Sequence, residues 1–220
     1  YIEGNYVDVL FIDLIQEAPN GTLIKYEKMS DFKRMSKSEL LQYQMTGKMP
    51  WGGVRKVANN KFLKENNICF SDNKVAEEAL YSFKLIYYSD KVGFLEKFCY
   101  HYINYEKSQS KAGGIDPWGN AVKEIRKFLK ENELEQVYES AINGFDYTSR
   151  VVVINRVVQR NTFFDAIKIL RELNINLDLC INKKYLDYRI ALIASVTNNI
   201  WVYFAAANIK CLLERIRHKK

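Results

Sequence analysis

The chain has 220 residues, of which 48% are hydrophobic and 27% are charged, with only ten glycines and three prolines. This composition excludes a disordered or fibrous chain and suits a globular protein of one large or two small domains. The formal net charge of +7 lies almost wholly in the second half of the chain. This positive charge could attract an anionic membrane surface, nucleic acid or a phosphate-linked acceptor. Alternatively, it is the solvated end of a helix.

Residues 1–16 predict an amphipathic helix. Their apolar side chains recur at the i, i+3, i+4, i+7 spacing of one helix face. The turn-forming sequence Pro19-Asn20-Gly21 follows and ends the helix. No secretory signal precedes it, and because the chain begins with tyrosine we expect a fragment or a processed product.

The next segments predict a strand, a helix and a loop. Residues 22–26 are β-branched and aromatic, which favours a strand, and residues 33–46 carry the apolar spacing of a helix. Residues 47–53 contain Pro50, Trp51 and two glycines, which favours a loop.

The organising stretch of the first half is residues 71–110, above all the adjacent pair Glu77 and Glu78. The pair opens a predicted helix, for which Ser71, Asp72 or Asn73 is the expected cap. A short strand at residues 91–95 and a segment rich in aromatic residues follow.

The second half predicts successive helices. Residues 110–117 form the expected linker, because two glycines and a proline prevent a helix or strand from continuing. Residues 151–158 are β-branched but have helical neighbours, so we expect a helix there. Residues 190–213 are interrupted by polar side chains, so they predict two buried helices broken at Asn198 and Asn199 rather than a membrane span.

Cysteine usage indicates a reducing compartment. The four cysteines form no Cys-x-x-Cys pair, and only two histidines accompany them, which argues against a zinc site. We expect reduced, mostly buried thiols in a cytosolic protein, with a disulfide framework as the alternative, at Cys69, Cys99, Cys180 and Cys211.

Three segments carry a resemblance to a known family. Residues 76–81, Ala-Glu-Glu-Ala-Leu-Tyr, resemble a Gly-Glu-Asp-x-x-Phe motif, with Ala76 in place of glycine and Glu78 in place of aspartate. Two further segments resemble those that flank this motif: residues 56–70, and residues 100–108, which begin Tyr-His-Tyr and end at Ser108. Residues 1–6 resemble the residues that follow an Asp-x-Asp metal motif. Together they resemble the second half of a family-two inverting glycosyltransferase of GT-A fold.

The resemblance implies an α/β fold with two parts. Residues 1–110 would be the acceptor-side half of the GT-A domain, and residues 111–220 a helical C-terminal domain. The chain would begin just after the Asp-x-Asp motif, so the nucleotide-sugar donor and a divalent cation, Mn²⁺ or Mg²⁺, would be bound by a part outside it. The implied function is cell-surface polysaccharide synthesis on a saccharide or lipid-linked acceptor, in the cytoplasm or at the inner face of the plasma membrane, without nucleic acid. The isolated fragment would be inactive.

The resemblance also assigns the carboxylate pair. Inverting transfer needs a base that takes the proton of the acceptor hydroxyl. By resemblance to the family's motif, Glu78 would be this base, and Glu77 beside it would bind acceptor hydroxyls or orient Glu78. Glutamates in the first turn of a helix are also favoured by its dipole without any catalytic role. The same dipole stabilises the anion and would make Glu78 a poorer base.

Aromatic residues are the further candidates for substrate binding. Trp51 lies in the glycine-rich loop, and His101 and Tyr102 follow the predicted strand. Their rings suit stacking on a sugar, while the Tyr and His polar atoms suit its hydroxyl groups. A core position is the alternative for each. An isoleucine, Ile103, stands where the family has a phosphate-binding arginine, so that contact is either missing or supplied by Arg55 or Lys107.

A non-enzymatic function is the alternative for the whole chain. In that interpretation the basic helical half docks on a membrane, nucleic acid or partner protein, and nothing depends on the carboxylate pair.

Overall fold

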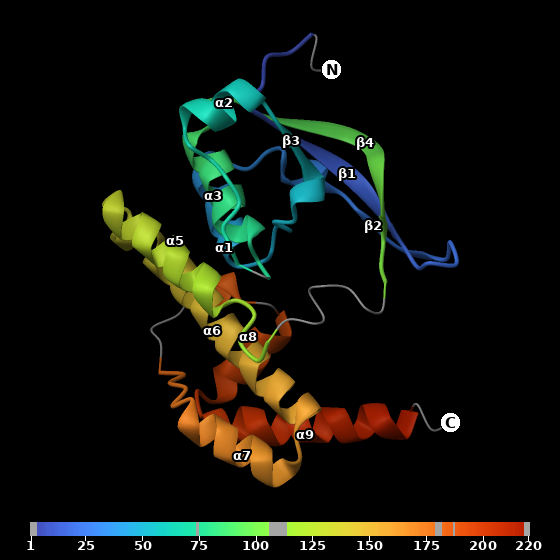
Figure 1. The fold of residues 1–220 in the computed structure, drawn as a ribbon, viewed down its shortest axis with the longest axis vertical. Coiled ribbons are helices and arrows are strands. Elements are labelled where there is room, and N and C mark those ends of the chain that lie inside the picture. Colours follow the sequence, from blue (N-terminus) through green and yellow to red (C-terminus); the bar gives the residue numbers. More distant parts are fainter. Residues whose placement is uncertain (1–3, 74, 106–113, 179–181, 187, 218–220) are drawn as a thin grey trace. The chain divides into compact units, whose positions relative to one another are not determined.

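The computed structural model describes residues 4–73, 75–105, 114–178, 182–186 and 188–217 (Figure 1). The chain divides into two compact units, Tyr1–Gly113 and Gly114–Lys220. Among the described residues, the first unit contains strands and helices and the second is helical. Cys180, Lys107, Ser108, the first part of the expected linker and the basic residues 218–220 lie outside the described residues.

The first unit is built on a four-stranded sheet with strand β1 at its centre. Strands β2 and β3 run antiparallel to β1, and β4 runs parallel to it. Because β4 pairs along the whole of β1, β2 and β3 share the opposite edge, and Figure 1 shows β4 beside β1. The strand bounds are Val9–Glu17 for β1, Leu23–Glu27 for β2, Lys56–Ala58 for β3 and Val92–Ile103 for β4.

The helix predicted at residues 1–16 is wrong, because residues 9–17 form β1. The consecutive side chains from Val9 to Leu14 are all buried, so both faces of the strand are covered. A strand that is buried on both faces has a continuous apolar run instead of alternation, and here that run matches helical spacing by coincidence.

The helices of the first unit pack against one another and against the sheet, where η1 contacts β1 and β4. Helix α1 packs against α3, and Ser36 and Glu39 form a capping box that begins α1. On the sheet, Phe11 stacks on Phe94 with ring centroids 5.2 Å apart. The helices are η1 Met29–Phe32, α1 Lys37–Met45, η2 Gly53–Arg55, α2 Asn60–Glu65 and α3 Glu78–Tyr88.

Several local predictions for this unit are confirmed. Residues 22–26 fall within or next to β2, and the helix expected at residues 33–46 is present as α1. The strand expected at residues 91–95 is the start of β4, which continues through the aromatic-rich segment to Ile103. Cys69 and Cys99 are exposed and Cys211 is half-buried, so the expectation of mostly buried thiols is wrong for the described cysteines.

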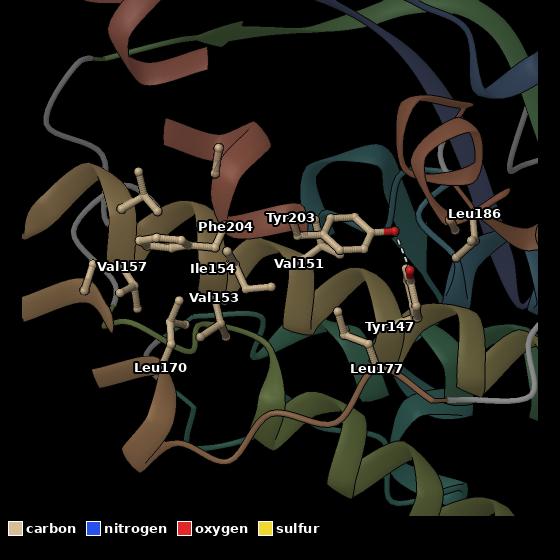
Figure 2. Packing of buried hydrophobic residues seen from close by; sticks show 14 residues of the cluster. Tyr147, Val151, Val153, Ile154, Val157, Leu170, Leu177, Leu186, Tyr203 and Phe204 are labelled. Atoms are coloured by element: carbon tan, nitrogen blue, oxygen red, sulfur yellow. Dashed lines mark hydrogen bonds between the residues drawn. The ribbon is translucent and has the colours of Figure 1, made fainter. Parts of the chain in front are cut away.

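The second unit is organised on the 26-residue helix α6, which packs against α5, α7, η3 and α9. Its core joins apolar side chains of α6 to α7 and α9 (Figure 2). Within it Tyr147 and Tyr203 share a hydrogen bond between their hydroxyl groups, and Tyr147 also donates to Asn198 Oδ1 at 3.4 Å. The elements are α5 Gly119–Glu131, α6 Glu135–Arg160, α7 Phe163–Glu172, η3 Lys183–Tyr185, α8 Tyr188–Val196 and α9 Ile200–Arg217.

Two predictions for the second unit are confirmed. Residues 151–158 lie inside α6, where burial in the core outweighs their strand propensity. The break at Asn198 and Asn199 separates α8 from α9, and the Asn199 side chain accepts a hydrogen bond from Trp201 N at 2.8 Å, which caps α9. The expectation that both helices are buried is wrong, because each exposes large apolar side chains. In the described part of the chain, none of the helices combines the length and the hydropathy needed to cross a membrane.

Candidate active site around Glu77 and Glu78

The carboxylate pair lies where the chain turns into α3. Glu78 is the first residue of the helix and Glu77 precedes it. Ala76 has φ +61°, a left-handed conformation that costs an L-residue other than glycine about 1–2 kcal/mol. The motif that this segment resembles has glycine at this position. Although the residue here is alanine, its backbone has the left-handed conformation that glycine adopts without steric cost.

The expected side-chain cap of α3 is wrong, because no side chain accepts a hydrogen bond from its first turn. Ser71 instead binds the turn through its backbone N–H and its hydroxyl, which both donate to the Glu77 carbonyl, at 3.1 and 3.4 Å. The helix start is therefore held by the preceding loop, and the carboxylate side chains of the pair are not used as caps.

The glycine turn before η2 lies directly over Glu78. A Cβ atom at Gly52 would be 2.1 Å from Arg55 Nη1 and 3.4 Å from Glu78 Oε1. The Arg55 guanidinium and the Glu78 carboxylate thus both approach the Gly52 backbone, which a larger residue would obstruct. Trp51, predicted separately as a site residue, directly precedes Gly52, so its backbone lies next to the turn that Glu78 approaches.

Arg55 connects the site to the sheet. Its Nε donates to the buried carboxylate of Glu27, which also pairs with Lys25 at 3.0 Å and accepts a hydrogen bond from Gln16 at 2.6 Å. Burial raises the pKa of Glu27, but the two cations outweigh this effect and leave the pKa below its usual value. Gln16 Oε1 in turn accepts from Asn104 at 3.2 Å, so polar contacts run from the end of β4 to Arg55.

Lys56 is a buried amine under the same turn. Its Nζ donates to the Trp51 carbonyl at 2.6 Å and to the Ser82 hydroxyl, and Ser82 donates to the same carbonyl at 2.6 Å. Burial lowers the pKa of Lys56 to about 7, and the nearby charge of Glu78 partly offsets this effect. The turn is thus fixed to the second turn of α3 through one lysine and one serine.

The environment makes Glu78 more basic. Burial is the largest effect and raises its pKa, and the charge of Glu77 raises it further. The charges of Lys56 and Arg55 lower the pKa, but they do not cancel these effects. The net change in the pKa of Glu78 is therefore opposite in direction to the one expected from the helix dipole alone. A carboxyl group whose pKa moves toward neutrality is better suited to accept a proton in a reaction.

An aromatic pair lies next to the turn. Phe70 stacks on Tyr81 of α3 with ring centroids 4.2 Å apart, and Phe70 Cζ lies 3.5 Å from the position of a Cβ at Gly53. Phe70 is half exposed, so this pair offers a flat apolar surface one turn beyond Glu78. The sequence analysis missed Phe70, Tyr81 and Ser82 as site residues, although each lies within or next to the resembling segments.

His101 and Tyr102 lie on β4, opposite Ile15 and Gln16 of β1. His101 is exposed, and its Nδ1 is 3.2 Å from the Glu17 carboxylate. Tyr102 is half-buried next to Gln16, which binds Glu27 and so leads to Arg55. These two residues are therefore connected to the turn through the sheet, and the structure shows no direct contact between them and the carboxylate pair.

The described residues include no group of three or more His, Cys, Asp or Glu side chains that could hold a metal ion. No site in this part of the chain fits the divalent cation that the family resemblance implies. The chemistry that this site offers consists of a basic carboxylate, a neighbouring carboxylate, two cations and an aromatic surface.

Comparison with known proteins bears on the fold. No family model matches the sequence, and no curated protein matches it. The S. aureus protein TarS, residues 1–349 in complex with UDP-GlcNAc, matches with a TM-score of 0.51 at 18% sequence identity. The match covers 100% of this chain and 62% of that chain. The chain thus has a mixed α/β fold similar to part of a glycosyltransferase, as predicted from the sequence.

Proposed function

We propose that this chain is the acceptor-side part of an inverting glycosyltransferase, with Glu78 as the general base. The observation that supports this most strongly is the position of Glu78: it begins α3 beneath the Gly52 turn, and the pKa of its carboxyl group is raised. The similarity of the fold to TarS supports the same reaction class.

In the proposed reaction the Glu78 carboxylate takes the proton of an acceptor hydroxyl as its oxygen attacks the anomeric carbon. The new bond between carbon and the acceptor oxygen forms as the bond to the nucleotide diphosphate breaks, and the diphosphate leaves with the electron pair. Glu77 orients the acceptor hydroxyls, and Trp51, His101 and Tyr102 contact the sugar rings. The proposed donor is a nucleotide sugar, and the acceptor is a saccharide or a lipid-linked saccharide of a cell-surface polysaccharide.

The donor and its cation belong, in this proposal, to residues beyond this chain. The chain covers 62% of the TarS chain that it matches. A divalent ion, Mn²⁺ or Mg²⁺, would neutralise the charge of the departing diphosphate there. The isolated chain should then show no transfer, and the proposed location is the cytoplasmic side of the membrane.

The test uses the full-length protein that contains this sequence, supplied with nucleotide sugars, including UDP-GlcNAc, and with Mn²⁺ or Mg²⁺. Glu78→Gln should lower kcat by roughly 10²- to 10⁴-fold, because the base is lost while the side chain keeps its shape. Glu135→Gln, which changes the exposed first residue of α6, is the matched control and should leave kcat unchanged.

Two results would contradict the proposal. Transfer at an unchanged rate in Glu78→Gln would remove Glu78 from the role of base. Absence of both binding and turnover of every nucleotide sugar tested would reject the transferase function itself.

A further inference from the structure

Helix α9 carries apolar side chains on two opposite sides. One set, which includes Tyr203, Phe204 and Ala207, is buried in the core of the second unit (Figure 2). Because each residue turns a helix by about 100°, a second set lies roughly 160° away from the first. We call this second set the α9 outer face, and its exposed members are Val202, Ile209, Leu212, Leu213 and Ile216.

The outer face is too apolar to be an ordinary solvated surface. Ile209 is 61% exposed, Leu212 58% and Leu213 54%. Scattered apolar residues on a surface need no explanation, but a continuous stripe along one helix indicates a binding surface.

A groove of about 760 Å³ adjoins the outer face, where α9 passes the end of α6 and the start of α7. Ile209, Leu212 and Phe163 contribute apolar walls, and the charged residues that line it are Arg160 and Arg215, with no carboxylate among the lining residues. Phe164, 80% exposed beside Phe163, extends the apolar surface. The groove therefore combines an apolar floor with two guanidinium groups.

Carboxylates on the neighbouring surface are engaged. Glu214 lies 3.8 Å from Lys210, and Asp165 accepts a hydrogen bond from the Thr162 hydroxyl at 2.6 Å. The described side chains of α9 include two cations, Lys210 and Arg215, and one carboxylate, Glu214. The surface that surrounds the apolar stripe thus attracts anions.

We propose that the α9 outer face and its groove dock on the headgroup region of an anionic lipid bilayer. The apolar side chains would enter the boundary between headgroups and acyl chains, while Arg160 and Arg215 meet lipid phosphates. This is an interfacial contact, which requires no membrane-crossing helix. It is independent of the proposed glycosyltransferase function, since no residue of the Glu78 site takes part.

Charge distinguishes this occupant from a second copy of the chain. A two-fold symmetric interface places each surface against the same surface of the partner. An interface centred on the groove would then contain Arg160 and Arg215 of both copies and no carboxylate from the groove lining, and like charges oppose association. An anionic bilayer neutralises the same arginines and covers the same apolar stripe.

The experiment is co-sedimentation of the complete chain with vesicles of phosphatidylcholine, with and without phosphatidylserine. The wild-type chain should bind the anionic vesicles and release them as salt rises. Arg160→Gln with Arg215→Gln should weaken binding roughly 25-fold, about five-fold for each charge removed. Leu212→Ser with Leu213→Ser should weaken it at least ten-fold.

Val137→Ser is the matched control, because Val137 is an equally exposed apolar residue at the start of α6 and outside the groove. It should bind vesicles like the wild-type chain. Circular dichroism and thermal unfolding of each variant verify that the second unit remains folded, and Leu213→Ser alone provides a milder second variant.

Several results would overturn the proposal. Equal binding to vesicles of phosphatidylcholine alone, or no binding to either kind, would exclude an anionic bilayer. A molar mass by light scattering that doubles in the wild type and falls to the monomer in Leu212→Ser would identify a second copy as the occupant. Binding of inorganic phosphate at the arginines without vesicle binding would indicate a site for a soluble anion.

Discussion

Lys56 and Glu78 influence each other's charge beneath the Gly52 turn. The carboxylate of Glu78 raises the pKa of Lys56, while the amine of Lys56 lowers the pKa of Glu78. Burial acts in the opposite direction on each, and for both residues burial is the larger effect. The site therefore holds two groups whose charged forms are both disfavoured by the same desolvation.

Stability should rise with pH above neutrality because of Lys56. The folded-state pKa of about 7 lies below the ordinary lysine value of 10.5, so the unfolded chain binds more protons between these values. The free energy of unfolding should therefore increase from pH 7 upward, by at most about 1.4 kcal/mol per pH unit.

Urea unfolding between pH 7 and 9 measures this slope, and it stays below the range in which tyrosines titrate. In Lys56→Met the slope above pH 7 should disappear, whereas Lys61→Met, at an exposed position of α2, should keep it. Equal slopes in wild type and Lys56→Met would show that Lys56 is not desolvated.

Ala76→Gly should stabilise the first unit. Glycine adopts φ +61° without the steric cost that alanine carries, so the expected gain in the free energy of unfolding is about 1 kcal/mol. Ala79→Gly, inside α3, should instead lose about 1 kcal/mol. Urea midpoints of the two variants measure the difference, and a loss in both would contradict the left-handed conformation of Ala76.

Gly52→Ala and Gly53→Ala should differ sharply. The new methyl at residue 52 would displace the Arg55 guanidinium, so Glu27 would lose its closest cation, at a cost of about 1–3 kcal/mol for a buried carboxylate. At residue 53 the methyl would lie 3.5 Å from Phe70, an ordinary contact, and little change is expected.

The pKa of Glu27 reports the same displacement directly. In Gly52→Ala, carbon-13 chemical shifts of the Glu27 carboxyl group should show a pKa higher than in the wild type. An unchanged pKa in Gly52→Ala would mean that Arg55 does not hold this position.

The tyrosine pair in the second unit predicts a non-additive result. Tyr203→Phe leaves the buried Tyr147 hydroxyl with only its longer hydrogen bond to Asn198, at a cost of about 1–3 kcal/mol. Adding Tyr147→Phe removes the unsatisfied group, so the double variant should be no less stable than Tyr203→Phe. Thermal unfolding measures this, and additive losses would contradict it.

Local signals in the sequence were sufficient for most elements. Asn199 caps a helix with its side chain, and residues 151–158 are surrounded by helical neighbours, so both features could be read without tertiary information. The strand β1 could not, because its pairing partners on β4 lie up to 86 residues away and its burial on both faces removes the alternation that marks a strand.

The candidate site was only partly predictable for the same reason. Glu78 was predicted because its segment resembles a family motif, and Trp51 because it is an aromatic residue in a glycine-rich loop. The roles of Lys56 and Arg55 depend on the Gly52 turn meeting α3 and β2 in space, and a lysine in a sequence gives no sign that it will be buried. The raised pKa of Glu78 follows from that burial and could not be inferred from the charge of a helix start alone.

The length of α6 limits how this protein can change during evolution. One inserted or deleted residue within its 26 would rotate everything beyond it by about 100°, and the neighbours on α5, α7 and α9 could no longer be matched at both ends. Related sequences should therefore keep the length of α6 fixed. Their insertions should fall in the turns on either side of α6, at residues 132–134 and 161–162.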